Sequence, residues 1–165
     1  MTHENRKSIL FVCLGNICRS PLAEAVFRDI VETAGAAHRF EIDSAGTGAW
    51  HVGNPPDPRS VEVGRRHGID LSGLRARKVA QPDFDRFDLI LGMDRSNVAN
   101  LTAMAPASSR ARIAEFHDFS TGTPRDVPDP YYGGDDGFEE VYRMIRAAAG
   151  SLFEKLGADM RGVSG

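Results

Sequence analysis

Apolar residues along this chain are grouped in two ways, as short continuous runs and as helically spaced positions. The runs lack a helical period, which is typical of strands buried on both faces of a parallel sheet. Four strands are therefore expected, at residues 8–14, 40–45, 87–92 and 112–116.

Helical spacing begins where the first of these runs ends. Ser20 and Pro21 are expected to be the N-cap and the first residue of a helix that continues to Ala34. After a loop rich in glycine and proline, Pro58 is expected to open a second helix over residues 59–67.

The second half of the chain predicts two further helices and a long loop. Ser96 can cap a short helix, and residues 117–136 predict a surface loop because they are rich in aspartate, proline and glycine. Strands alternate with helices, so the predicted fold class is α/β with a mainly parallel sheet. We expect one domain over residues 1–165, with residues 1–7 disordered. The C-terminal helix should bury Val141, Ile145, Ala148, Leu152, Phe153 and Leu156.

Composition narrows the classes of function. The chain has 165 residues, 26% of them charged, and a formal net charge of −3. This weakly acidic balance offers no basic surface for nucleic acid, and no apolar run approaches the roughly 20 residues that insertion into a membrane requires. The polar N-terminus carries no signal-peptide pattern. Cys13 and Cys18 are too close in sequence to link distant parts of a secreted fold, so we expect free thiols in the reducing cytoplasm.

Residues 13–20 carry the clearest chemistry, because they join a predicted strand to a helix N-terminus. Ligands of open α/β sheets bind at this edge, and free N–H groups at a helix start attract anions. Gly15 permits a close backbone approach, and Asn16 tolerates a left-handed turn. Consecutive N–H groups can then converge on one phosphate group.

Three side chains of this loop suit phosphoryl transfer. Cys13, beside a helix N-terminus and Arg19, is expected to be a thiolate nucleophile. Arg19 can hold two phosphate oxygens with its planar guanidinium group and follow the charge into the transition state. The hydroxyl of Ser20 can donate a hydrogen bond to the thiolate, which must later act as a leaving group.

The segment resembles the phosphate-binding loop of the low-molecular-weight protein-tyrosine phosphatase family, and the resemblance covers nearly the whole chain. Residues 44–47 (SAGT) resemble the family's second-strand motif, residues 93–97 (MDRSN) the segment after its third strand, and residues 129–131 (DPY) its general-acid loop. The resemblance implies one domain built on a four-stranded parallel sheet flanked by helices, with the phosphate-binding loop inside an N-terminal β-α-β unit.

The resemblance also implies a mechanism. The chain would hydrolyse phosphotyrosine and aryl phosphates through a phosphocysteine on Cys13, without a metal or other cofactor. Arg19 would stabilise the transferred group, and Asp129 would protonate the leaving phenolate and then activate water. Asn16 and Ser44 would brace the loop. A phosphotyrosine-containing protein is the expected substrate, with a tyrosine kinase as the expected partner enzyme.

Expected substrate contacts follow from the same resemblance. Trp50 would stack on the phenyl ring, and Tyr131 and Tyr132 would form the other wall of a slot deep enough for phosphotyrosine. An isoleucine at position 17 accompanies aryl phosphate in the family, and Asp94 is expected to be a supporting residue. The expected substrate-binding residues are Leu14, Gly15, Asn16, Ile17, Cys18, Ser20, Trp50, Tyr131 and Tyr132.

Three assignments stay open. Cys18 either fills a small apolar space or is a backup thiol that captures oxidised Cys13, and the family supports the second role. Asp126 competes with Asp129 as general acid, which is preferred because it begins the DPY motif. The family often places a loop-bracing histidine where this chain has Gly73, so the brace is weaker or another group provides it.

Three alternative functions remain. An arsenate reductase of the same fold would need further cysteines, and none follows Cys18. A protein-arginine phosphatase is disfavoured by Ile17, since that branch of the family carries a threonine there. A catalytically silent phosphate-binding module would have no need of Cys13 or Asp129.

Overall fold

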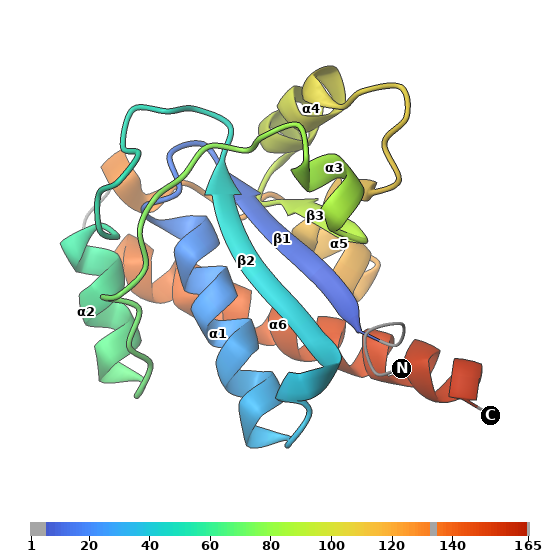
Figure 1. The fold of residues 1–165 in the computed structure, drawn as a ribbon. Helices are drawn as coiled ribbons and strands as arrows, with labels where there is room; N and C mark the ends of the chain where they lie inside the picture. The colour runs from blue at the N-terminus through green and yellow to red at the C-terminus, as the bar shows by residue number, and fades with distance from the viewer. Residues whose placement is uncertain (1–5, 133–134, 165) are drawn as a thin grey trace.

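A four-stranded parallel sheet runs through the middle of the computed structural model (Figure 1). The structure describes residues 6–132 and 135–164, and the side chains of 132, 135, 136 and 158–164 lie outside the description. The strands are ordered β2-β1-β3-β4, which confirms the predicted fold class. Their bounds are β1 Lys7–Cys13, β2 Phe40–Gly46, β3 Leu89–Gly92 and β4 Arg112–Glu115.

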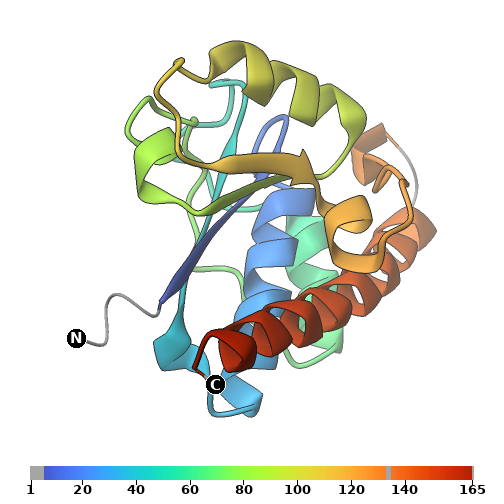
Figure 2. The same ribbon diagram turned by 90° about the vertical axis from the view of Figure 1, so that its right-hand side faces the viewer.

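Helices cover both faces of the sheet. One face carries α1 (Arg19–Thr33), α2 (Pro58–Arg66), α5 (Phe116–Thr121) and α6 (Asp135–Ser164), and Figure 2 shows α6 running across α1. The other face carries α3 (Asp83–Arg86) and α4 (Arg95–Met104).

Side chains of β1 alternate between two hydrophobic cores. Ile9 and Phe11 belong to the larger core with α1 and α6, whereas Leu10 and Val12 belong to the smaller one beneath α3 and α4. All four are fully buried. A strand buried on both faces has no polar alternation, which explains the continuous apolar run in the sequence.

Helix starts differ from the predicted ones. α1 begins at Arg19 with Cys18 at the N-cap, so Ser20 lies inside the helix and its hydroxyl is available for other contacts. The N-cap of α4 is Asp94 rather than Ser96. The Asp94 carboxylate accepts a hydrogen bond from the Asn97 N–H at 2.8 Å, and the Asn97 side chain accepts one from the Asp94 N–H at 3.2 Å. An aspartate that closes such a reciprocal pair caps better than a serine without one.

The long loop predicted over residues 117–136 is partly wrong, because it contains α5 and the short 3-10 helix η3 (Pro130–Tyr132). A second 3-10 helix, η2 (Ala37–Arg39), and α3 were not predicted either. These elements are too short to show a hydrophobic period. β1 begins at Lys7, inside the segment expected to be disordered, and residues 1–5 lie outside the described residues.

The strand order places the loop after β1 at a functional position. β1 pairs with β2 on one side and with β3 on the other, so the chain crosses over in opposite directions from this strand. Open α/β sheets bind ligands in the crevice at such a reversal. None of the helices in the described part of the chain has the length and hydrophobicity to cross a membrane.

Candidate active site

Residues 14–18 form a loop between β1 and α1, and several main-chain carbonyls in and beside it accept hydrogen bonds from neighbouring segments. The carbonyl of Cys13 accepts from the Thr47 N–H at 3.0 Å, that of Leu14 from the Gly48 N–H at 2.9 Å, and that of Ile17 from the Asp57 N–H at 2.8 Å. Among the described residues, no acceptor takes a hydrogen bond from the N–H groups of residues 14–18. These N–H groups are therefore available as donors to an oxyanion.

Two glycines allow the chain to pack this closely. A Cβ atom on Gly46 would lie 2.7 Å from the carbonyl oxygen of Leu14, and one on Gly15 would lie 2.9 Å from Cδ2 of His51. Both distances are shorter than real side chains tolerate. Gly15 had been expected to admit the phosphate group, and it also makes room for an imidazole ring.

Asn16 holds the loop in shape from its centre. Its φ of 58° is in the left-handed region, which only a few residue types enter without large cost. The Asn16 amide donates to Ser20 Oγ at 2.8 Å and to Ser44 Oγ at 3.0 Å, and its carbonyl accepts from the Arg77 N–H at 3.0 Å. The side chain thus ties the loop to α1, to β2 and to the segment before α3.

Glu24 completes this brace and was missed from the sequence. The Ser44 hydroxyl donates to Glu24 Oε1 at 2.7 Å, and Arg28 donates to Oε2 at 2.6 Å. Burial raises the pKa of Glu24, and the hydrogen bonds from Ser44 and Arg28 partly oppose that shift. Glu24 is thus a hydrogen-bond partner of Ser44, and the main-chain N–H of Arg77 is one of Asn16. The available signal was a lone glutamate among the apolar residues 21–27.

Cys13 lies at the floor of the loop and is 2% exposed. Its sulfur is 3.0 Å from the hydroxyl oxygen of Ser20. Because Asn16 donates to that oxygen, the Ser20 hydroxyl can direct its own proton to the sulfur or to the Ala45 carbonyl, whose oxygen is 3.4 Å away. The arrangement can stabilise negative charge on Cys13.

Arg19 is 2% exposed and is oriented by two acceptors. Its Nη1 donates to Asp94 Oδ2 at 2.6 Å and to the Val127 carbonyl at 3.0 Å. Although burial disfavours the charge, the proximity of Cys13 and the hydrogen bond with Asp94 raise the pKa of Arg19. The guanidinium group is therefore a fixed cation beside the sulfur.

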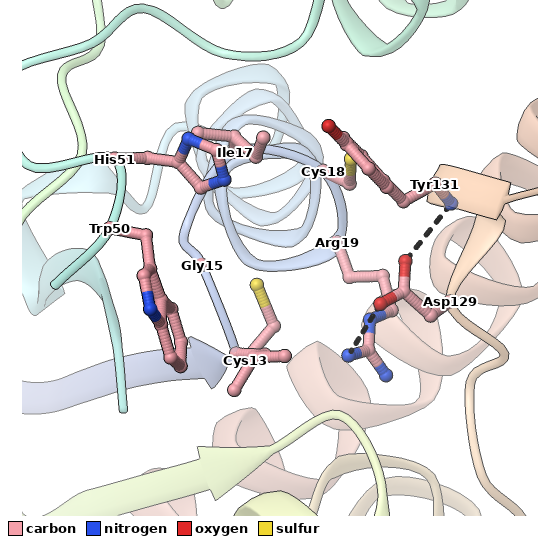
Figure 3. Close-up of a pocket in the computed structure, with 10 residues that line it drawn as sticks. Cys13, Gly15, Ile17, Cys18, Arg19, Trp50, His51, Asp129 and Tyr131 are labelled. Carbon is pink, nitrogen blue, oxygen red and sulfur yellow. Dashed lines mark hydrogen bonds and ion pairs between the residues drawn. The ribbon is translucent and has the colours of Figure 1, made fainter. Parts of the chain in front are cut away.

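Asp129 reaches the same cleft from the other end of the chain. Its Oδ2 is 3.7 Å from Arg19 Nη2, and its Oδ1 accepts from the Tyr131 N–H at 3.0 Å (Figure 3). Arg59 donates to the carbonyl of Tyr131, two positions after Asp129, at 3.1 Å. Asp126, the competing carboxylate, is absent from the residues that line the cleft and accepts from the Arg95 N–H instead.

Aromatic side chains flank a cleft of about 230 Å³ above the sulfur. Trp50 and Tyr131 lie on either side of Cys13, and His51 closes the top of the view in Figure 3. Trp50 is 71% exposed and Tyr131 is 40% exposed, so both rings have surface that an aryl group can contact. The described residues that line the cleft are Cys13, Leu14, Gly15, Ile17, Cys18, Arg19, Trp50, His51, Asp129 and Tyr131.

Four expected site residues lie outside that lining. Asn16, Ser20 and Ser44 are buried behind the loop, where they brace it, and Asp94 accepts from Arg19. The side chain of Tyr132 lies outside the described residues.

His51 and Arg59 were missed, although His51 follows the predicted Trp50 and Arg59 lies two residues after Asp57, the N-cap of α2. Histidine and arginine near a loop are too common to single out without coordinates.

Comparison with known proteins identifies the family. The family profile described as low molecular weight phosphotyrosine protein phosphatase matches residues 8–162. The chain belongs to this family. A member from Schizosaccharomyces pombe is 56% identical over 139 residues, covering 83% of this chain and 88% of the relative. The phosphatase YfkJ from Bacillus subtilis is 45% identical over 150 residues, covering 90% of this chain and 95% of the relative.

A solved structure agrees with the assignment. The crystal structure of a protein tyrosine phosphatase from Entamoeba histolytica, with Hepes in its active site, matches this fold with a TM-score of 0.87 at 38% identity. The match covers 93% of this chain and 98% of that one. Membership of the family makes this chain an enzyme, a phosphatase that works through a phosphocysteine intermediate.

Proposed function

We propose that this chain dephosphorylates phosphotyrosine in protein substrates, with Cys13 as nucleophile, Arg19 as phosphate ligand and Asp129 as general acid and base. The observation that carries the proposal is the convergence of these three side chains on one cleft, beside a loop whose N–H groups have no acceptor among the described residues. Together they supply a nucleophile, a fixed cation, oxyanion donors and a proton source.

The first step transfers the phosphoryl group to the enzyme. The Cys13 thiolate forms an S–P bond while the bond from phosphorus to the phenolic oxygen breaks. Asp129 gives its proton to the departing oxygen, since a phenolate with a pKa of about 10 leaves more readily as the phenol. Arg19 and the loop N–H groups hold the three other phosphate oxygens throughout.

The second step restores the enzyme. Asp129, now a carboxylate, removes a proton from water, whose oxygen attacks phosphorus as the S–P bond breaks. The electron pair returns to Cys13, and the Ser20 hydroxyl, 3.0 Å away, stabilises the thiolate that leaves. The Cys13 sulfur and Asp129 are thereby returned to their starting protonation states.

The cleft favours an aryl substrate. Trp50 and Tyr131 can contact both sides of a phenyl ring, and Ile17, rather than the threonine of the arginine-specific branch, lines the cleft. A protein-arginine phosphatase is therefore the weaker candidate. The arsenate reductase alternative lacks the further cysteines it would need, since the chain has only two.

A reducing compartment suits this chemistry. Cys13 and Cys18 are both free thiols, and oxidation of Cys13 would remove the nucleophile. A cytoplasmic location is proposed on that basis. A tyrosine kinase that supplies the phosphorylated protein is the proposed partner enzyme.

The direct test is hydrolysis of 4-nitrophenyl phosphate in excess EDTA by the wild type and by Cys13→Ser and Asp129→Ala. Cys13→Ser should abolish turnover, and Asp129→Ala should lower kcat/KM by about 100-fold or more. Asp85→Ala, an exposed aspartate on α3, is the matched control and should leave turnover unchanged. Equal activity of Asp129→Ala and the control would reject Asp129 as the acid. Turnover by folded Cys13→Ser would reject the nucleophile.

A further inference from the structure

Two carboxyl groups meet behind the loop that carries Asp129. Glu115 is the last residue of β4 and is 9% exposed, and Asp126 lies three positions before Asp129. The two carboxyl groups interact closely enough for each to shift the pKa of the other. Oε2 of Glu115 is buried and accepts no hydrogen bond from a donor among the described residues.

Two carboxylates offer only acceptors and repel each other, so a neighbouring pair favours a proton on one of its members. Glu115 is the better site for it. Burial, the hydrogen bond to Asp126 and the charges of Asp126 and Asp118 raise its pKa. The hydrogen bond from Glu115 and the contacts with Arg95 lower the pKa of Asp126. A proton on Glu115 would remove the repulsion between the two carboxylates and let Glu115 donate to Asp126.

The other oxygens of the pair fasten the chain to two elements. Oε1 of Glu115 accepts from the Arg125 N–H at 2.7 Å, which anchors the loop to β4. Oδ1 of Asp126 accepts from the N–H of Arg95, the first residue of α4, at 3.0 Å. The pair thus ties the loop that contains Arg125 and Asp126 to both β4 and α4.

Val127, the residue after Asp126, connects this anchored loop to the active site. Val127 is fully buried, its N–H donates to the Met93 carbonyl at 2.9 Å, and its carbonyl accepts from Arg19 at 3.0 Å. Asp129 follows two positions later with 34% of its side chain exposed, so the segment before it fixes where its carboxyl group lies.

We propose that Glu115 is a positioning residue for the general acid: by accepting from the Arg125 N–H and packing against the carboxyl group of Asp126, it holds the loop so that Asp129 meets the leaving oxygen. The inference rests on the proposed role of Asp129. It predicts that loss of Glu115 weakens protonation of the leaving group while phosphate binding at residues 13–19 persists.

The test compares kcat/KM for two substrates, phenyl phosphate and 4-nitrophenyl phosphate, whose leaving groups differ in their need for a proton. Glu115→Ala should lower kcat/KM for phenyl phosphate by about tenfold more than for 4-nitrophenyl phosphate. Glu115→Gln should restore the wild-type ratio, because its amide can donate to Asp126 and accept from the Arg125 N–H. Each protein is its own control, since general loss of folded enzyme lowers both rates equally.

Asp126→Ala is the second variant, because its side chain is 39% exposed and its loss is less prone to disturb the core. It should shift the ratio in the same direction as Glu115→Ala. Asp129→Ala, measured in parallel, separates the two proposals. An unchanged ratio in Asp129→Ala would overturn the general-acid assignment itself. A shifted ratio in Asp129→Ala, with wild-type ratios in folded Glu115→Ala and Asp126→Ala, would overturn the role of Glu115 alone.

Discussion

The side-chain amide of Asn16 donates a hydrogen bond to the hydroxyl of Ser44 at 3.0 Å, across 28 positions of sequence. This bond links a loop residue with φ of 58° to the strand beside it. A left-handed asparagine costs about 1 kcal/mol or more unless its surroundings hold it there. The shape of the loop therefore depends on contacts made outside the loop.

Removing the Asn16 side chain should relax the loop. Asn16→Ala loses hydrogen bonds to Ser20, Ser44 and the Arg77 N–H, which leaves buried groups unsatisfied at a cost of about 1–3 kcal/mol. We expect kcat/KM for 4-nitrophenyl phosphate to fall by about 10- to 100-fold, and competitive inhibition by inorganic phosphate to weaken. Asn100→Ala, on an exposed position of α4, is the control. Unchanged phosphate affinity in Asn16→Ala would contradict the brace.

Asp94 should affect both α4 and the orientation of Arg19. Its Oδ1 caps the helix and its Oδ2 accepts from Arg19 at 2.6 Å. Asp94→Asn keeps one acceptor oxygen, which can serve the helix cap or Arg19 but not both. Asp94→Ala keeps neither acceptor. We expect Asp94→Ala to lose about 1 kcal/mol of stability and about tenfold or more in kcat/KM, with Asp94→Asn between it and the wild type.

Thermal unfolding and steady-state kinetics check this prediction together. Ser96→Ala is the matched control at a neighbouring exposed position that is not the cap. If Asp94→Ala lowers stability but leaves kcat/KM unchanged, Asp94 is only a helix cap and does not orient Arg19.

The sequence was most informative where chemistry and local structure coincide. Cys13, Arg19 and Ser20 fall in one short segment whose apolar strand and helix start are visible without coordinates, and the fold class follows from the alternation of elements. The position of Asp129 depended on family resemblance, because an aspartate in a loop of aspartates has no periodicity to distinguish it.

Long-range polar contacts could not be predicted. Glu24 lies 20 positions from Ser44, and Glu115 lies 11 positions from Asp126, so their meeting depends on how helices and loops pack on the sheet. A buried glutamate is recognisable only once its burial is known. The same limit explains why Ser20 was expected to cap α1, whereas the folded chain directs its hydroxyl to Cys13.

Glu24 should make stability depend on pH with a definite sign. Its pKa is raised in the folded state, so between its ordinary value and the raised one the native protein holds a proton that the unfolded chain has released. The Glu24 contribution is therefore present at low pH and is lost as pH rises through the folded pKa. Glu24→Gln has no such group, so its stability relative to the wild type should rise from pH 4 to pH 7.

Urea unfolding of both proteins across that range gives the difference directly, since other carboxyl groups contribute equally to the two curves. Glu32→Gln, an exposed glutamate on the same helix, is the control and should follow the wild type. A difference between Glu24→Gln and the wild type that stays constant or falls with pH would contradict the raised pKa.

Cys18 should be chemically silent in the folded protein at neutral pH. It is 5% exposed, and burial, with the charges of Asp57, Cys13 and Asp129, raises its pKa to about 12. Only the thiolate is alkylated at an appreciable rate, so its reactive fraction at pH 8 is about 10⁻⁴. In Cys13→Ser, where Cys18 is the remaining cysteine, iodoacetamide should leave the native protein unmodified and alkylate it quickly in urea.

Mass spectrometry of the alkylated protein measures this, and Cys18→Ser reports Cys13 alone under the same conditions. Native Cys13→Ser should react about tenfold faster for each unit of pH up to pH 10, since its thiolate fraction rises by that factor. Rapid alkylation of native Cys13→Ser at pH 7 would show that Cys18 is an accessible thiolate. The same property limits Cys18 as a backup thiol: it can attack oxidised Cys13 quickly only after the loop opens or the pH rises.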